Sequence, residues 1–152
     1  MIQGLYEAHL PVRNLKQSIE FYKKLELEIA FQNDQAAFFW IVKGQSWIVL
    51  WETDFVDTPY HPSVRHLALQ VELEDIKNAK QWLAERNIRV VETFGFPPEK
   101  QPLVLPNNPQ AHAAIYFEDL DGNVLEFIAP LRLDVKEDFP MMSLEEWEKR
   151  KK

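Results

Sequence analysis

Short apolar runs broken by turn residues make up most of the chain, a pattern typical of strands. In one place in each half, apolar residues recur three and four positions apart instead, and this spacing predicts an amphipathic helix. The first helix is expected to follow Asn14, a favourable N-cap, and to end near Leu27. The strands expected in the first half cover residues 5–12, 28–31, 36–42 and 46–52.

The second half begins the same order again. A strand is expected at residues 64–71, a helix after the N-cap Asp75, and a further strand at residues 89–93. Residues 95–110 contain five prolines and are expected to form a long loop.

A hairpin is expected to close the second half. Apolar runs at residues 113–117 and 124–128 flank Asp121-Gly122-Asn123, and Gly122 can supply the positive φ that a tight turn needs. The return run is apolar except for Glu126. This carboxylate faces either solvent or a group that requires charge.

The two halves share one pattern. Residues 14–22 align with residues 75–83 at an offset of 61, and Leu27 matches Ile88 at the same offset. This repeat predicts an α+β fold of two paired βαβββ modules. Two such sheets, joined side by side, are expected to form a curved mixed sheet around a cleft, with the helices outside.

A single domain is expected over residues 1–131. Within it the first module covers residues 5–54, a linker covers 55–63, and the second module covers 64–131. The linker is inferred from its prolines and from its lack of periodicity.

Residues 132–152 form a tail outside the repeat. Ser143 and Glu146 have the spacing of a capping box, which predicts a short helix from Leu144 that presents Leu144 and Trp147 together. We expect this tail to dock on the domain or on a partner subunit, and we expect a homodimer.

Composition narrows the classes of function. The chain has 152 residues, is 46% hydrophobic and carries a net charge of −7, so it can build a core but is repelled by phosphate backbones. We therefore expect no nucleic-acid partner, and the apolar runs are too short to span a membrane. No signal peptide is evident at the N-terminus and no Cys is present, so we expect a cytoplasmic protein without disulfides or a thiolate metal site.

Three residues of metal-ligand type occupy matching places in the repeat. His9 and His66 lie in the strands that open the two halves, and Glu126 lies in the strand that closes the second. Two imidazoles and one carboxylate suit a catalytic divalent metal with open positions, either zinc-like or as in non-haem iron enzymes. Two tryptophans, Trp47 and Trp51, alternate on one strand face and either line an apolar substrate pocket or pack in the core.

The motifs of the chain resemble the vicinal oxygen chelate superfamily, which includes glyoxalase I, bleomycin-resistance proteins, extradiol dioxygenases and fosfomycin-resistance thiol transferases. The resemblance rests on residues 9–12, 18–25, 66–71 and 116–126. It implies paired βαβββ modules and a metal held at the places of His9, His66 and Glu126.

The chain departs from the family pattern at several places. Many members have a fourth ligand in the last strand of the first module, but the matching stretch, residues 48–50, is apolar, and Glu52 lies too far along. Three ligands are the pattern of the thiol transferases and the extradiol dioxygenases. Residues 106–112 replace the potassium-binding loop expected of the fosfomycin enzymes, which disfavours fosfomycin as the substrate. Glu26 stands where the family usually has Gly.

The extradiol enzymes carry additional catalytic His and Tyr groups, and His112 and Tyr116 could take these roles because alternation places both on one strand face. We therefore expect a metal-dependent enzyme that chelates two oxygens of a small substrate on Fe, Zn, Mn or Ni. Its reaction would be that of a lyase or isomerase, a thiol transferase or a ring-cleaving dioxygenase. The alternative is a metal-free protein that sequesters a small hydrophobic or drug-like molecule, with the histidines and the glutamate hydrogen-bonded to one another.

Overall fold

The computed structural model describes residues 1, 4–57, 65–106, 110–131 and 139–150. The chain divides into two compact units. Unit 1 comprises Met1–Arg65 together with Asp119–Asn123, and unit 2 comprises His66–Glu118 together with Val124–Lys152. The expected linker and tail lie partly outside the described residues.

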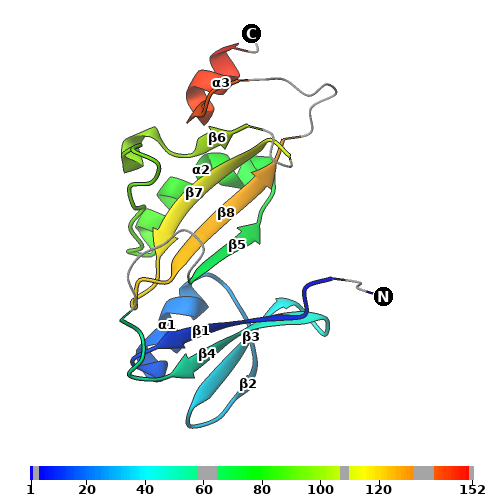
Figure 1. Ribbon diagram of the computed structural model, residues 1–152, viewed down its shortest axis with the longest axis vertical. Coiled ribbons are helices and arrows are strands. Elements are labelled where there is room, and N and C mark those ends of the chain that lie inside the picture. The colour runs from blue at the N-terminus through cyan, green and yellow to red at the C-terminus, as the bar shows by residue number, and fades with distance from the viewer. Residues whose placement is uncertain (2–3, 58–64, 107–109, 132–138, 151–152) are drawn as a thin grey trace. The chain divides into compact units, whose positions relative to one another are not determined.

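Unit 1 contains a four-stranded mixed sheet and one helix (Figure 1). The sheet order is β1-β4-β3-β2; β1 runs parallel to β4 and the other neighbours are antiparallel. The elements are β1 (Glu7–Val12), α1 (Leu15–Lys24), β2 (Ile29–Gln32), β3 (Ala36–Val42) and β4 (Ser46–Glu52). This is the βαβββ order that the sequence predicts, and β3 and β4 have the predicted bounds.

Helix α1 begins where its backbone N–H groups find acceptors. Asn14 is the N-cap, and its Oδ1 accepts a hydrogen bond from Gln17 N at 2.9 Å, as predicted. Glu52 Oε2 accepts from Leu15 N at 2.7 Å, so this carboxylate stabilises the start of the helix. The helix ends before Glu26, which has a φ of 63°.

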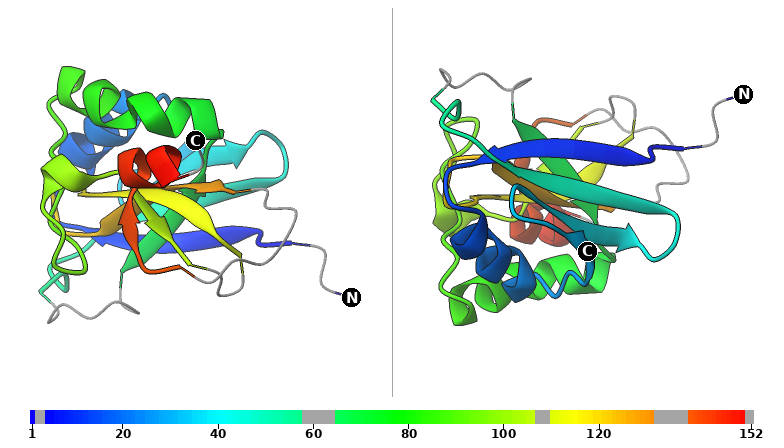
Figure 2. Two further views of the ribbon diagram at one scale, coloured as in Figure 1. Left: turned by 90° about the horizontal axis from the view of Figure 1, so that it is seen from above. Right: turned by 90° about the horizontal axis from the view of Figure 1, so that it is seen from below.

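One face of the sheet of unit 1 packs against α1 (Figure 2). Tyr22 of α1 contacts Phe39 of β3, with ring centroids 5.8 Å apart, and Ile48 and Leu50 of β4 are buried on the same side. The alternation of β-strands sends the neighbouring residues of β3 and β4 to the opposite face.

Unit 2 contains a five-stranded mixed sheet with order β5-β8-β7-β6-β9 (Figure 1). β5 runs parallel to β8, and the other neighbours are antiparallel. The elements are β5 (His66–Gln70), α2 (Leu73–Glu85), η1 (Pro98–Lys100), β6 (Leu103–Leu105), β7 (His112–Glu118), β8 (Val124–Pro130), β9 (Met142–Ser143) and α3 (Leu144–Arg150). The two mixed sheets and their helices confirm the predicted α+β class.

Helix α2 packs on β7 and β8 (Figure 2). Trp82 of α2 contacts Phe127 of β8, with ring centroids 5.9 Å apart. Because side chains alternate along a strand, Glu126 and its cross-strand neighbour Tyr116 lie on the face away from α2.

Two details of the predicted second half are wrong. Residues 89–93 form only isolated bridges, because the chain turns at Phe94 and Gly95, which have φ values of 49° and 75°. The strand is instead β6, within the stretch predicted as a proline-rich loop. Helix α2 starts at Leu73 after Glu72, so Asp75 lies in its first turn and is not the N-cap.

The repeat extends to the helix ends. Asn87 has a φ of 57°, and it stands 61 residues after Glu26. Both residues adopt the left-handed conformation that glycine favours, and each follows the last turn of its helix. The backbone turn is therefore kept without glycine in both halves.

The C-terminal segment docks on unit 2. Ser143 N donates to Glu146 Oε2 at 3.0 Å and Glu146 N donates to Ser143 Oγ at 3.2 Å, which confirms the predicted capping box. Leu144 and Trp147, which the sequence predicts to be presented together, are both buried. β9, which the sequence does not predict, pairs with β6.

Among the described residues, no helix has the length and hydropathy needed to cross a membrane.

The carboxylate of Asp119 organises the turn that belongs to unit 1. Its Oδ1 accepts from the backbone N of Asp121 and of Asn123, both at 2.9 Å. Its Oδ2 accepts from Tyr22 Oη at 2.9 Å and from Asn123 Nδ2 at 2.6 Å. Asn123 Nδ2 also donates to Pro11 O at 3.0 Å, so one buried acid connects the turn, α1 and the end of β1.

Burial shifts the proton equilibria of this cluster. Desolvation raises the pKa of Asp119, although the hydrogen bonds it accepts act in the opposite direction. Burial also raises the pKa of Tyr22 well above its usual value, and the charge of Asp119 adds to this rise. The phenol therefore stays protonated and serves as a donor.

Replacement of Asp119 is expected to destabilise unit 1. Asp119→Ala leaves several buried donors without an acceptor and should lower the free energy of unfolding by about 2–4 kcal/mol. Asp119→Asn should lower it less, because the amide oxygen can still accept from the two backbone N–H groups. Urea denaturation measures both values, and the exposed Asp34→Asn should stay within about 0.5 kcal/mol of wild type.

The same cluster predicts a pH dependence. The pKa of Asp119 is higher in the folded than in the unfolded chain, so the folded protein binds more protons between these two values. The contribution of Asp119 to stability should therefore fall as pH rises from below about 3.9, the usual pKa of Asp, through the folded pKa. The stability difference between wild type and Asp119→Asn should decrease over this window. A difference that is flat or grows with pH contradicts the assignment.

Candidate metal and substrate site

His66 and Glu126 meet on the face of the sheet of unit 2 that lies away from α2. They lie on the parallel strands β5 and β8. Ala68 of β5 is directly opposite Glu126 of β8, and His66 precedes Ala68 by two residues. His66 Nε2 lies 2.9 Å from Glu126 Oε2, and the two side chains are 27% and 7% exposed. A buried carboxylate therefore has an imidazole as its partner.

The pair fits a divalent cation. Two ligand atoms that each lie about 2.1 Å from a metal ion at a right angle are about 3 Å apart, which agrees with the observed separation. The same distance fits a hydrogen bond from the imidazole N–H to the carboxylate. Metal ligation at Nε2 would therefore displace the proton that this bond uses.

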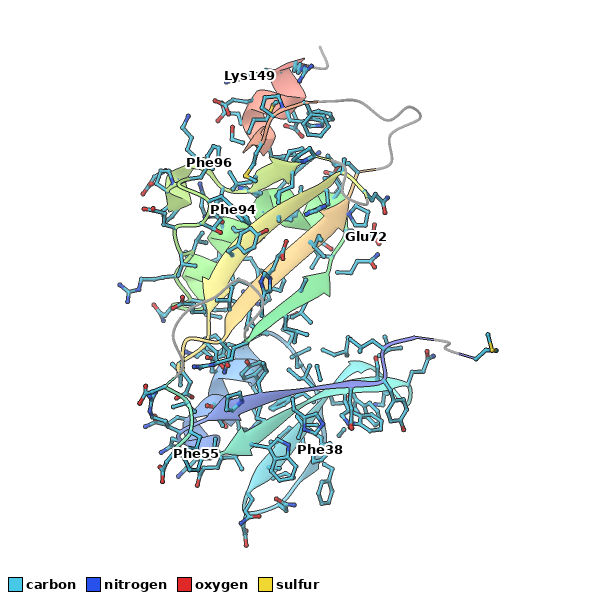
Figure 3. All side chains as sticks on the ribbon, viewed as in Figure 1. Phe38, Phe55, Glu72, Phe94, Phe96 and Lys149 are labelled. Carbon is cyan, nitrogen blue, oxygen red and sulfur yellow. The ribbon has the colours of Figure 1, made fainter. Side chains whose placement is uncertain are left out.

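Tyr116 lies beside this pair. It is the cross-strand neighbour of Glu126, it is buried, and its ring makes an edge contact with that of His66, with centroids 6.1 Å apart. Phe94, labelled in Figure 3 beside β7, makes a second edge contact with Tyr116 at 5.8 Å. The phenol predicted as a catalytic group is thus placed near the candidate ligands.

His112 lies on the same strand face as Tyr116, four residues earlier in β7. At about 3.3 Å per residue, this separates the two residues by about 13 Å along the strand. His112 Nδ1 lies 2.8 Å from the carbonyl oxygen of Gln110, which can only accept, so Nδ1 carries the proton and Nε2 keeps the lone pair. In this tautomer, Nε2 of His112 can accept a proton or bind a metal ion.

His9 belongs to unit 1 and lies on the sheet face opposite α1. Its Nδ1 accepts a hydrogen bond from Trp51 Nε1 at 2.8 Å, and its Nε2 lies 3.3 Å from Glu7 Oε1. Glu7 therefore lies on the same strand face as His9. The expected metal set therefore draws on His9 from unit 1 and on His66 and Glu126 from unit 2.

Within each unit taken by itself, the described residues contain no group of three His, Cys, Asp or Glu side chains that could hold a metal. Val49, in the stretch predicted to match a fourth ligand, is the register partner of His9 and cannot ligate. Glu52 binds the start of α1, as described above.

The predicted pocket residues Trp47 and Trp51 belong to a larger aromatic face. Trp47 contacts Tyr6 and Trp40, with ring centroids 4.4 and 5.4 Å apart, and donates from Nε1 to Glu7 Oε2 at 2.9 Å. The aromatic face is defined by Tyr6, Phe31, Phe38, Trp40, Trp47 and Trp51; Phe38 is labelled in Figure 3.

Sequence reasoning missed three neighbours of these groups. Phe38 and Trp40 could have been found, because alternation in β3 and pairing with β4 place them beside Val49 and Trp47. Phe94 could not, because it reaches Tyr116 from an irregular turn.

The family model described as the Glyoxalase/Bleomycin resistance protein/Dioxygenase superfamily matches residues 4–127. The chain therefore belongs to this superfamily, which agrees with the resemblance found in its motifs.

Three individual proteins illustrate what this chain is similar to. The chain is 29% identical over 154 residues to a protein named metallothiol transferase FosB from Staphylococcus saprophyticus subsp. saprophyticus, which covers 97% of this chain and 93% of the relative. An integron cassette protein from the Halifax Harbour sewage outfall is 25% identical, with a TM-score of 0.64, over 84% of this chain and 99% of its own. The fosfomycin resistance protein FosX from Listeria monocytogenes shares the fold, at 22% identity and a TM-score of 0.61, over 85% of this chain and 94% of its own.

A double-mutant cycle tests the His66–Glu126 pair in chelator-treated protein. His66→Ala leaves a buried carboxylate without its imidazole and should lower the free energy of unfolding by about 1–3 kcal/mol. The same substitution in a Glu126→Gln background should cost less, giving a coupling energy of about 1–2 kcal/mol by urea denaturation. A coupling energy near zero would show that the two groups do not interact.

Proposed function

We propose that this protein is a metal-dependent enzyme in which His9, His66 and Glu126 hold a divalent cation, with Fe, Zn, Mn and Ni as candidates. The observation that carries the proposal is the buried Glu126 carboxylate placed 2.9 Å from an imidazole on the sheet face away from α2. Structural carboxylates are seldom buried without a strong partner, and an imidazole–carboxylate pair is a common part of catalytic metal sites. The expected homodimer stays a prediction.

A bound divalent cation would act as a Lewis acid toward two oxygens of a small substrate. Tyr116, next to the pair, is proposed to give a proton to an oxygen that gains charge during the reaction. His112 Nε2, with its free lone pair, is proposed to accept a proton at the far end of a ligand that extends along the strand. Trp47 and Trp51 are proposed to supply an apolar wall for the substrate.

The relatives favour thiol transfer among the reactions expected from the sequence. FosB is named a metallothiol transferase. The family resemblance implies three ligands for that class, the number proposed here. In this reaction the sulfur of a low-molecular-weight thiolate forms a bond to an electrophilic carbon, and the bond from that carbon to oxygen breaks. The released oxygen takes the Tyr116 proton, which solvent then replaces.

A specific observation supports the alternative of a metal-free sequestering protein. His66 and Glu126 already satisfy one another by a hydrogen bond, and the aromatic face of unit 1 includes the exposed Tyr6, Phe31 and Trp51. Such a protein would bind a flat apolar molecule by ring contacts and would need no cation. Metal affinity separates the two functions.

Metal titration of chelator-stripped protein tests the proposed ligands. Isothermal titration with Mn²⁺ and Zn²⁺ should show binding by wild type and a loss of at least about 100-fold in affinity for His66→Ala and Glu126→Ala, because each removes a direct ligand. His9→Ala should also lower the affinity for both ions. Glu28→Ala, which removes an exposed carboxylate paired with Lys43, serves as the control and should leave the affinity unchanged. Absence of metal binding by wild type would contradict the proposal of a metal-dependent enzyme.

Product analysis tests the reaction. Metal-loaded protein incubated with a small epoxide and either glutathione or L-cysteine should form a thioether adduct detectable by mass spectrometry. Fosfomycin is the first epoxide to test because relatives are named for resistance to it, although the sequence at residues 106–112 disfavours it. Tyr116→Phe should lower kcat by about 100-fold or more with little change in KM, because only the proton donor is lost. If loaded enzyme forms no adduct, while Mn²⁺ and Zn²⁺ bind as expected, the metal site stands but thiol transfer to this electrophile is wrong.

A further inference from the structure

The histidines of the two units have equivalent neighbours on the adjacent parallel strand. In unit 2, Glu126 of β8 lies opposite the residue two places after His66. In unit 1, Trp51 of β4 lies opposite the residue two places after His9. Relative to its histidine, Trp51 therefore occupies the position that Glu126 occupies in the other unit. The position equivalent to Glu126 is therefore Trp51, one residue beyond the stretch 48–50 that the sequence matches.

These two neighbours have opposite hydrogen-bonding character. The carboxylate of Glu126 accepts, whereas the indole of Trp51 can only donate. Trp51 Nε1 lies 2.8 Å from His9 Nδ1. The two ring planes are 16° apart and their centroids are separated by 6.2 Å, so the rings meet edge to edge and the indole N–H points at the lone pair in the imidazole plane.

This bond fixes where the His9 proton lies. A neutral imidazole has one lone pair and carries its proton on the other nitrogen. Because Nδ1 accepts from Trp51, the proton is on Nε2, which lies 3.3 Å from Glu7 Oε1. Glu7 is held in turn by Trp47, whose Nε1 donates to Oε2 at 2.9 Å. Both ring nitrogens of His9 thus have partners, and its one lone pair faces the indole of Trp51.

We propose that Trp51 is a positioning residue that competes with the metal for His9, so that the Trp51–His9 bond must break before His9 can ligate. The inference rests on the proposed function, in which His9 is the third ligand. Ligation through Nδ1 requires the indole N–H to leave that lone pair. Ligation through Nε2 requires the ring proton to move to Nδ1, and the indole N–H, now facing another N–H, must turn away. Trp51 is 40% exposed, so water can take up its N–H after release.

The competition lowers the apparent metal affinity by the fraction of protein in which His9 is released. Trp51→Phe keeps an aromatic ring and removes the donor, and the Trp40→Phe control has the same loss of ring size. In chelator-stripped protein, this variant should bind Mn²⁺ and Zn²⁺ about three- to ten-fold more tightly than wild type by isothermal titration, the range expected for the loss of one hydrogen bond. Trp40→Phe, a matched change on the same sheet face, should leave the affinity unchanged. An affinity of Trp51→Phe equal to or weaker than that of wild type overturns the proposal.

A second measurement needs no metal. Imidazole ¹⁵N chemical shifts of His9 in the metal-free protein should report the Nε2–H tautomer in wild type and in Trp40→Phe, and a loss of that preference in Trp51→Phe. A wild-type His9 with its proton on Nδ1 overturns the proposal. If His9→Ala binds metal as tightly as wild type, the competition is wrong because His9 is no ligand, and the proposed trio fails with it. If only the Trp51→Phe affinity fails to rise, the trio stands.

Discussion

The hydrogen bonds accepted by the Asp119 carboxylate are the interaction on which the described part of unit 1 most depends. They fix the five-residue turn Asp119–Asn123 against Tyr22 of α1 and, through Asn123, against the end of β1. The turn stands in the chain between β7 and β8 of unit 2. Among the described residues no buried side-chain nitrogen or oxygen lacks a partner, so the desolvation that raises the pKa of Asp119 is offset by four hydrogen bonds. The same turn carries Asp121, which pairs with Arg13.

Much of this fold can be predicted from the sequence, because local signals and tertiary structure agree. Asn14 caps the first helix as predicted, the strands at residues 36–42 and 46–52 have the expected bounds, and the offset of 61 extends to the left-handed Glu26 and Asn87. The prediction fails where local signals mislead. Val90 and Val91 favour a strand, but the turn at Phe94 and Gly95 limits their pairing to an isolated bridge.

The candidate site could be predicted only in part, because some of its contacts join residues that are far apart in the sequence. His66 and Glu126 are conspicuous by residue type and by their places in the repeat, and the pairing of β5 with β8 brings them together. The two partners of His9 differ in whether the sequence could predict them. Glu7 follows from alternation within one strand, but the bond from Trp51 depends on the register of the parallel pair β1 and β4, which no local pattern sets.

The duplicated architecture places equivalent backbone positions in both halves while leaving each side chain free to differ. At the position beside the opening histidine, one half has the acceptor Glu126 and the other has the donor Trp51. The Glu126 carboxylate supplies negative charge and accepts from an imidazole N–H, whereas the Trp51 indole is neutral and donates to the imidazole lone pair. Under the proposed function, Glu126 is a ligand to the cation, whereas Trp51 occupies the His9 lone pair until the histidine is released. The difference at this one register position gives the two opening histidines different hydrogen-bond partners.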